Sequence, residues 1–219
     1  MSENGYLEKL CEAYQNNGLK KQWEHLMNIA TGISAEDKAA LLAEYPDCPP
    51  ELLSILDRID GTYYRNYNGT EVACFIFASD VEDGEYPYYL LSAKQILSDK
   101  DCGRYFDDLV NDAFHEPKNA NYKWYGPFCD SRITTEHEKR RFLHFADCMN
   151  NGGTSSLYID FSPAESGVKG QIVRFLHDPD ELKVIANSFR ELLAMIVEQG
   201  FAFIQPTDAE SIVIHTYHD

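Results

Sequence analysis

The feature that most limits how this chain can fold is a stretch of apolar runs and turn formers between residues 142 and 177. Three apolar runs, at residues 142–146, 155–161 and 171–176, are separated by connections that contain glycine, asparagine or proline. Runs of this length between turn formers predict a meander of three antiparallel strands. Glycine in the first connection can adopt the positive φ that a tight turn needs. We expect the rest of the chain to cover or extend this meander.

Composition places the chain among packed globular proteins. At 219 residues it can build one sizeable core, and 44% hydrophobic with 13% aromatic residues excludes the disordered class. The six cysteines are widely spread and form no C-x-x-C pair, so no disulfide framework is expected. The first residues have no signal-peptide pattern, and no window is apolar for long enough to span a membrane. These observations predict a cytoplasmic protein with no membrane partner.

The net charge of −17, from 36 acidic and 19 basic residues, is the overall property of the sequence that says most about its possible partners. Such a charge repels nucleic acid and anionic membranes, and it attracts basic proteins and speeds their encounter. High acidity can also serve solubility alone. Both interpretations remain open at this point.

Helical periodicity dominates the N-terminal part. Apolar stripes predict three helices within residues 3–45, which together form a helical arm, and Ser34 is expected to cap the third. After a proline step, Pro50 is placed to begin a fourth helix over residues 51–59. Asp60-Gly61 is expected to end it.

The later segments predict further strands and helices around the meander. The apolar run at residues 71–79 predicts one buried strand. The other expected elements are a short strand at 88–91, a helix at 92–97, a helix from about 102 to 114, a helix at 188–197 and a strand within 211–217.

Four segments in this order resemble the SMI1/KNR4 family of the SUKH superfamily. They are the proline-led helix of residues 49–61, the strand and helix of residues 89–96, the run from Phe145 to Pro163, and residues 170–173 together with the final helix at 188–197. The third carries the Asn-Gly-Gly step and the Leu-Tyr-Ile-Asp-Phe-Ser-Pro sequence that are similar to the family's central signature. Single positions of each motif recur by chance, whereas their order and spacing are fairly specific.

The resemblance implies an α+β fold with a single mainly antiparallel sheet and helices packed on one side, preceded by the N-terminal helical arm. We expect the arm at residues 1–45 and the family domain at residues 46–219. In bacteria the family is implied to supply immunity proteins, which bind and neutralise cognate toxins. Fungal relatives are implied to be regulators, so the alternative is a regulatory or scaffold protein that binds a cellular partner. No catalytic residue is implied.

The sequence shows no known catalytic or metal-binding pattern, so we expect no enzymatic activity, no cofactor and no metal. Nucleotide-binding, hydrolase and zinc-protease motifs are absent from the sequence. Two minor alternatives remain open. A metal could be held near His137, His144, Asp147 and Cys148, or Asp147 and Asp160 could pair as general acid and base. Either would make the chain an unrecognised hydrolase or metalloenzyme.

The predicted partner-binding surface combines carboxylates with tyrosines between residues 60 and 89. Tyrosine offers a large contact area at a small entropic cost and is enriched in interfaces. A tyrosine patch surrounded by carboxylates would suit a toxin with a basic surface, although some of these tyrosines could instead cover the sheet. The residues expected to bind the partner are Tyr63, Tyr64, Tyr67, Asp80, Glu82, Asp83, Glu85 and Tyr86.

Overall fold

The computed structural model of the chain describes residues 5–81, 87–102, 106, 128–148, 155–177, 180–205 and 213–216. Its helices are α1 (Gly5–Asn16), α2 (Lys20–Ile29), α3 (Ala35–Glu44), α4 (Pro50–Leu56), α5 (Ala93–Ser98) and α7 (Phe189–Glu198), with a 3-10 helix at His137–Lys139. Its strands are β1 (Arg65–Tyr67), β2 (Thr70–Ala73), β3 (Phe75–Phe77), β4 (Tyr88–Leu90), β5 (Phe128–Cys129), β6 (Phe142–Cys148), β7 (Ser155–Asp160), β8 (Gln171–Leu176), β9 (Glu181–Ala186) and β10 (Val213–Thr216). The α+β class and the N-terminal helices are confirmed.

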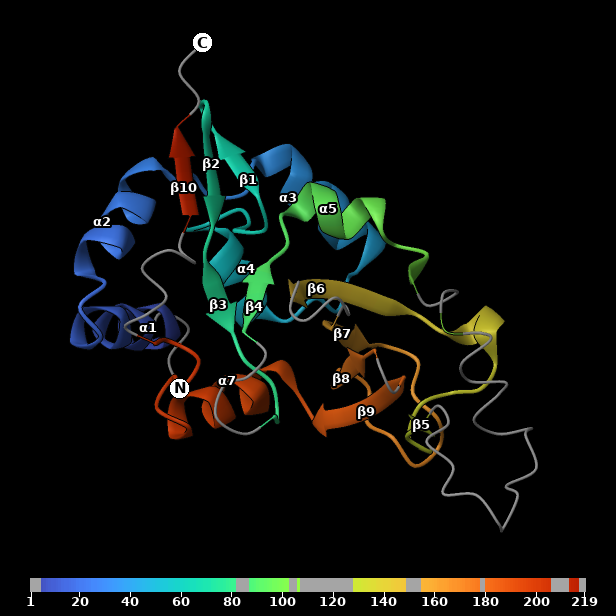
Figure 1. Ribbon diagram of the computed structural model, residues 1–219. Coiled ribbons are helices and arrows are strands. Elements are labelled where there is room, and N and C mark those ends of the chain that lie inside the picture. Colours follow the sequence, from blue (N-terminus) through green and yellow to red (C-terminus); the bar gives the residue numbers. More distant parts are fainter. Residues whose placement is uncertain are drawn as a thin grey trace.

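The large sheet is built around the predicted meander. Its strand order is β3-β4-β6-β7-β8-β9-β5, so that β6, β7 and β8 occupy the centre. Neighbouring strands are antiparallel, except that β5 runs parallel to β9. A second sheet, in the order β1-β2-β10, lies beyond the end of β3 and β4 (Figure 1). The expected single sheet is therefore accompanied by a second, smaller one, which the sequence did not indicate.

The prediction of one strand over residues 71–79 is wrong, because the chain passes from one sheet to the other at Cys74. The Cys74 N–H donates to the Thr62 carbonyl at 3.3 Å, and the Thr62 hydroxyl donates to the Cys74 carbonyl at 2.6 Å. These bonds hold residue 74 against a loop, so β2 ends at Ala73 and β3 begins at Phe75. The apolar run is continuous because both strands are buried.

Strand β9 was not predicted, and its side chains explain why. Leu182, Val184 and Ala186 are buried, whereas the residues between them are partly exposed. This half-buried alternation is weaker than a continuous apolar run, although it is the normal signal of a strand with one open face. The predicted helix over 102–114 lies outside the described residues, apart from 102 and 106.

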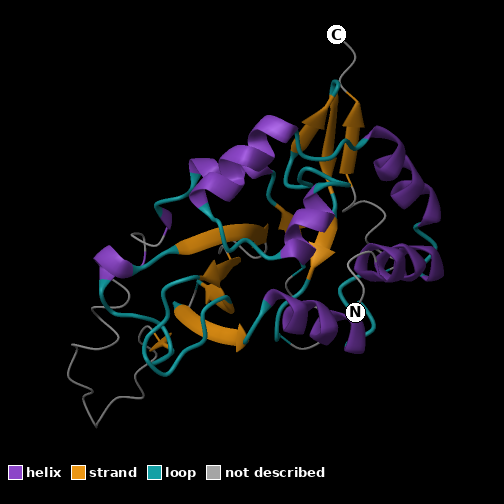
Figure 2. Cartoon of the chain, turned by 180° about the vertical axis from the view of Figure 1, so that it is seen from behind, coloured by secondary structure: helices purple, strands orange, loops and turns teal. Residues whose placement is uncertain are grey.

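The two faces of the large sheet are covered differently. Helices α1, α4 and α7 contribute buried side chains to the main core on one face, together with Leu143, Phe145 and Leu157 of the sheet. A smaller core on the opposite face contains Phe142 and Tyr158, and it is covered by residues 102, 106, 129 and 133. Figure 2 shows the longer helices above, beside and below the strands, and loops at the end of the molecule away from the N-terminus. The predicted arrangement of helices on one side of the sheet is therefore confirmed.

Helix α1 lies against β3, which is the first strand in the order of the large sheet. The Tyr14 hydroxyl donates to the Phe75 carbonyl at 2.7 Å, and the Tyr6 hydroxyl donates to the Ile76 carbonyl at 2.6 Å. Both tyrosine side chains are fully buried. The arm therefore satisfies two main-chain acceptors of an edge strand, which would otherwise be open to another strand.

We expect the double substitution Tyr6→Phe and Tyr14→Phe to lower the free energy of unfolding by about 2 kcal/mol. Each change removes the buried hydrogen bond to β3, worth roughly 1 kcal/mol, and keeps the ring. Tyr14→Phe also removes the acceptor of the weaker bond from Cys74 Sγ, at 3.5 Å. Chemical denaturation measures the loss of stability. Relative to wild type, amide hydrogen exchange in the double variant should speed up more in β3 than in β7. Unchanged exchange in β3 would contradict the role given to the two hydroxyls.

None of the helices in the described ranges has the length and apolar character that a bilayer crossing requires.

Candidate partner-binding surface

Three tyrosines form an aromatic group where the loop before β1 meets β4. The ring centroids of Tyr63 and Tyr64 are 5.3 Å apart, and both lie within 5.8 Å of the Tyr89 ring. Phe75 packs behind Tyr89 at 4.7 Å. We call Tyr63, Tyr64 and Tyr89 the tyrosine cluster. It contains two of the predicted partner-binding residues and one, Tyr89, that was left out of that set.

Tyr64 is the exposed member of the tyrosine cluster, with 48% of its surface accessible. Its φ of +47° lies in the left-handed region, which is uncommon for a residue with a bulky side chain. The backbone before it is fixed, because the N–H groups of Thr62 and Tyr63 both donate to the Leu90 carbonyl. The Gln95 side chain also donates to the Tyr63 carbonyl at 3.1 Å. The ring is thus presented by a rigid loop.

Asp147 adds a carboxylate beside the tyrosine cluster. It lies directly opposite Tyr89 in the β4–β6 ladder, so that the two side chains point to the same face. Burial raises the pKa of Asp147, and burial together with the nearby Asp147 charge raises the pKa of Tyr63. Burial also raises the pKa of Tyr89, so the phenols of Tyr63 and Tyr89 stay protonated as hydrogen-bond donors at neutral pH. Sequence reasoning did not place Asp147 here, because the strand register decides its neighbours.

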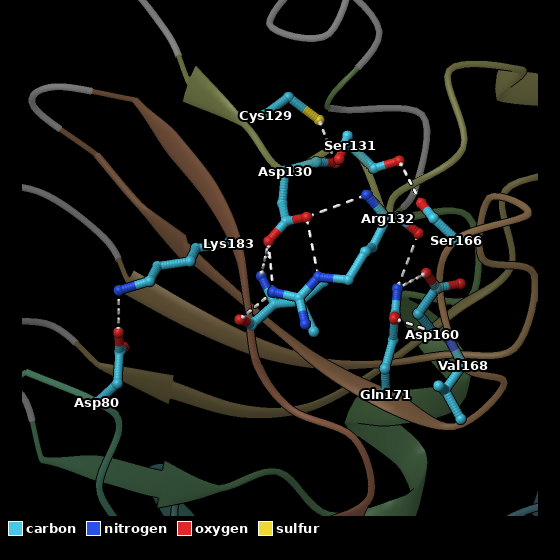
Figure 3. Close-up of polar contacts among 11 residues, drawn as sticks. Asp80, Cys129, Asp130, Ser131, Arg132, Asp160, Ser166, Val168, Gln171 and Lys183 are labelled. Atoms are coloured by element: carbon cyan, nitrogen blue, oxygen red, sulfur yellow. Dashed lines mark hydrogen bonds and ion pairs between the residues drawn. The ribbon is translucent and has the colours of Figure 1, made fainter.

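The other described residues of the predicted surface lie elsewhere. Tyr67 is buried, and its hydroxyl donates to the Gly61 carbonyl at 2.8 Å, which is a structural role. Asp80 accepts from Arg174 Nε at 2.7 Å and from Lys183 Nζ at 2.5 Å, and Figure 3 shows the second contact. Both of its oxygens are therefore engaged within the sheet. Glu82, Asp83, Glu85 and Tyr86 lie outside the described residues.

Neither catalytic alternative finds support in the side-chain geometry. His144 Nδ1 lies 2.7 Å from the Asp99 carboxylate and Nε2 lies 3.1 Å from the Ala146 carbonyl, so both nitrogens face oxygen acceptors. In the part of the chain that the structure describes, no three metal-ligating side chains converge. Asp147 is opposite Ser156 whereas Asp160 is opposite Phe142, at the other end of the β6–β7 ladder. The proposed acid–base pair of Asp147 and Asp160 is therefore wrong.

The aspartate of the central signature, Asp160, joins two loops to the sheet. It is fully buried, and it accepts hydrogen bonds from the Ser162 N–H at 2.8 Å and from Gln171 Nε2 at 2.9 Å. The Gln171 amide also donates to the Arg132 carbonyl, at 3.1 Å, and its oxygen accepts from the Val168 N–H (Figure 3). Asp160 thus has a structural role.

The segment that covers the smaller core is fastened beside this network. Asp130 accepts from Arg132 Nε at 3.0 Å and from Arg132 Nη2 at 2.6 Å, and Arg132 Nη2 also donates to the Val184 carbonyl (Figure 3). These contacts hold the pKa of the Asp130 carboxyl below its ordinary value, although its burial opposes the shift. The two charges are paired with each other and with the β9 backbone.

Comparison with known proteins identifies a family. No curated protein matches the chain. The model of the SMI1 / KNR4 family (SUKH-1) matches residues 32–195, which is more than half of the sequence and includes α3 through most of α7. The predicted boundary at residue 46 remains a prediction. With the α+β architecture and the central meander in place, the chain belongs to the SMI1 / KNR4 family (SUKH-1).

Proposed function

We propose that this protein is a non-catalytic immunity protein, which neutralises a cognate protein toxin by covering the toxin's basic surface. The observation that carries the proposal is the exposed ring of Tyr64, which a rigid loop holds against Tyr63 and the buried Tyr89 on a chain of net charge −17. Membership of the SMI1 / KNR4 family supports a role in binding another protein. The partner surface would be Tyr63, Tyr64 and Tyr89 with Asp147 beside them.

The two parts of this surface would act at different stages of binding. The excess negative charge would draw a basic partner in and raise the association rate, which salt would then lower. The tyrosines would form the desolvated centre of the contact, where a few aromatic side chains supply most of the binding energy. Because the loop around Tyr64 is held by three hydrogen bonds, little ordering would be needed on binding.

The test is co-expression with the toxin that is encoded beside this gene. The wild-type chain should restore growth and co-purify with the toxin. Tyr64→Asn should weaken the complex at least tenfold, since it removes an exposed anchor. Asparagine is the preferred replacement because it tolerates the left-handed φ better than other polar residues.

Phe128→Asn is the matched control, because Phe128 is 51% exposed on β5 at the other end of the large sheet. It should change the affinity less than twofold. Absence of both rescue and complex with the wild-type chain would refute neutralisation and leave the regulatory alternative. Wild-type affinity in Tyr64→Asn would show that the partner binds somewhere other than the tyrosine cluster.

A further inference from the structure

A cavity of about 300 Å³ opens at the start of β6, away from the tyrosine cluster. Its lining includes two aromatic rings, Tyr45 and Phe161, whose centroids are 5.9 Å apart. Two cations, Arg141 and Lys169, and one carboxylate, Asp47, complete the polar part of the lining. Arg141 precedes β6, whereas Asp147 beside the tyrosine cluster lies near the strand's far end, so the two sites are separate.

The aromatic wall is fixed by the fold. Tyr45 is buried, and its hydroxyl donates to the Phe142 carbonyl at 3.1 Å. The Arg141 guanidinium carbon lies 5.7 Å from the centre of the Tyr45 ring, an arrangement that holds the cation next to the ring face. A flat apolar group could pack against Tyr45 and Phe161 while its polar end met the cation.

The cations of this pocket have unused donor capacity. In the described part of the chain, the Arg141 side chain bonds only through Nη2, to the backbone oxygen and the carboxylate of Glu44, which leaves Nε and Nη1 without a hydrogen bond. Lys169 makes a single contact, 2.7 Å to the Asp47 carboxylate, although an ammonium carries three donors. Both ion pairs are more than one-third exposed, so they can exchange partners at small cost.

The unused N–H donors of Arg141 and Lys169 favour an anionic ligand. A guanidinium presents a planar fork that matches a carboxylate or a phosphate, and a neighbouring ammonium adds a second point of charge. The lining itself holds two cations and one carboxylate, and the Glu44 carboxylate that pairs with Arg141 is not part of the lining. A cavity of this size lies at the lower end of the range for small-molecule sites.

We propose that this pocket binds a small aromatic acid, with its carboxylate or phosphate on Arg141 and Lys169 and its ring against Tyr45 and Phe161. Asp47 opposes the ligand and holds Lys169 while the pocket is empty. The site does not depend on the toxin-binding surface, and its failure would leave the proposed function untouched.

The experiment titrates the full chain with N-acetyl-L-phenylalanine and with phenyl phosphate, followed by calorimetry or ligand-detected NMR. At least one of the two anions should bind saturably, and the preferred one identifies the carboxylate or the phosphate as the natural group. The neutral N-acetyl-L-phenylalanine amide should bind at least tenfold more weakly than its acid. Lack of saturation with both anions, or equal binding of acid and amide when the acid binds, would overturn the proposal.

Variants assign the binding to this cavity. Arg141→Gln and Lys169→Gln should each weaken the anion at least fivefold, and Asp47→Asn should strengthen it at least threefold. Arg58→Gln is the matched control, since it removes an exposed guanidinium outside the cavity, and it should leave the affinity within twofold of wild type. Because Lys169 is exposed and outside any helix or strand, Lys169→Gln keeps the test valid even if Arg141→Gln disturbs α3. Wild-type affinity in Lys169→Gln, or an affinity in Asp47→Asn that is equal or weaker, would overturn the assignment.

Discussion

Gly61→Ala is expected to lower the free energy of unfolding by about 4 kcal/mol, the combined effect of a left-handed backbone and a steric clash. Gly61 has a φ of +94°, and a Cβ at this position would lie 2.6 Å from the Ser92 backbone nitrogen. Ser92 cannot move away freely, because its side chain and backbone form the capping box at the start of α5. The neighbouring Asp60 also accepts a hydrogen bond from the Ala93 N–H, at 2.9 Å. The clash therefore falls on a helix start that is fixed from two directions.

Gly69→Ala separates the two contributions. Gly69 has a similar φ of +89°, but a Cβ there would meet no atom within 4 Å. Only the conformational cost remains, so we expect a loss of about 1 kcal/mol. Urea denaturation of both variants gives the comparison. Equal losses would show that the approach of Gly61 to Ser92 is not what requires glycine in this family motif.

Asp160→Ala is expected to lower the free energy of unfolding by about 3 kcal/mol at pH 5. The substitution leaves the Ser162 N–H and the fully buried Gln171 amide without their acceptor, and each stranded donor costs roughly 1–3 kcal/mol. Asparagine would not restore the site. Its amide would face the Gln171 Nε2 donor, and Gln171 cannot turn round because its oxygen accepts from the Val168 N–H. Ser166→Ala, at an exposed hydroxyl that donates at 3.3 Å to the Ser131 carbonyl, should cost less than about 0.5 kcal/mol.

The cost of Asp160→Ala should also depend on pH. Burial raises the pKa of Asp160 to about 6, above its ordinary value of 3.8. A raised pKa means that the folded protein holds this proton more tightly than the unfolded chain. The part of the stability that comes from this bound proton is complete below pH 3.8 and is lost as the pH rises through 6. The difference in stability between wild type and variant should therefore be smaller at pH 7 than at pH 5, by about 1 kcal/mol. A difference that grows towards pH 7 would contradict this assignment.

The sequence predicted those elements that depend on local pattern. Ser34 caps α3 by accepting from the Asp37 N–H at 3.0 Å, and Pro50 begins α4, as the capping rules indicate. The division of residues 71–79 could not be predicted in this way. It depends on two hydrogen bonds between Cys74 and Thr62, twelve residues earlier, and a cysteine within an apolar run carries no sign of them.

The candidate surface shows the same limit. The tyrosine-rich loop was visible in the sequence, and Tyr63 and Tyr64 do lie together. Tyr67 and Asp80 could not be separated from them by composition, because only the fold shows that one hydroxyl and one carboxylate are used internally. Asp147 reaches the tyrosine cluster through the pairing of β4 with β6, a contact between residues that are far apart in the chain.

The contact between α1 and β3 has a consequence for self-association. The family match begins at residue 32, so α1 and α2 lie outside the part of the chain that the family shares. Without Tyr6 and Tyr14, two carbonyls of a buried, aromatic edge strand would lose these hydrogen bonds, and an open edge of this type can recruit a second copy of the same sheet. We therefore expect the N-terminal helices to oppose edge-to-edge pairing of the large sheet with a second copy. The net charge of −17 would oppose the approach of a second copy at longer range.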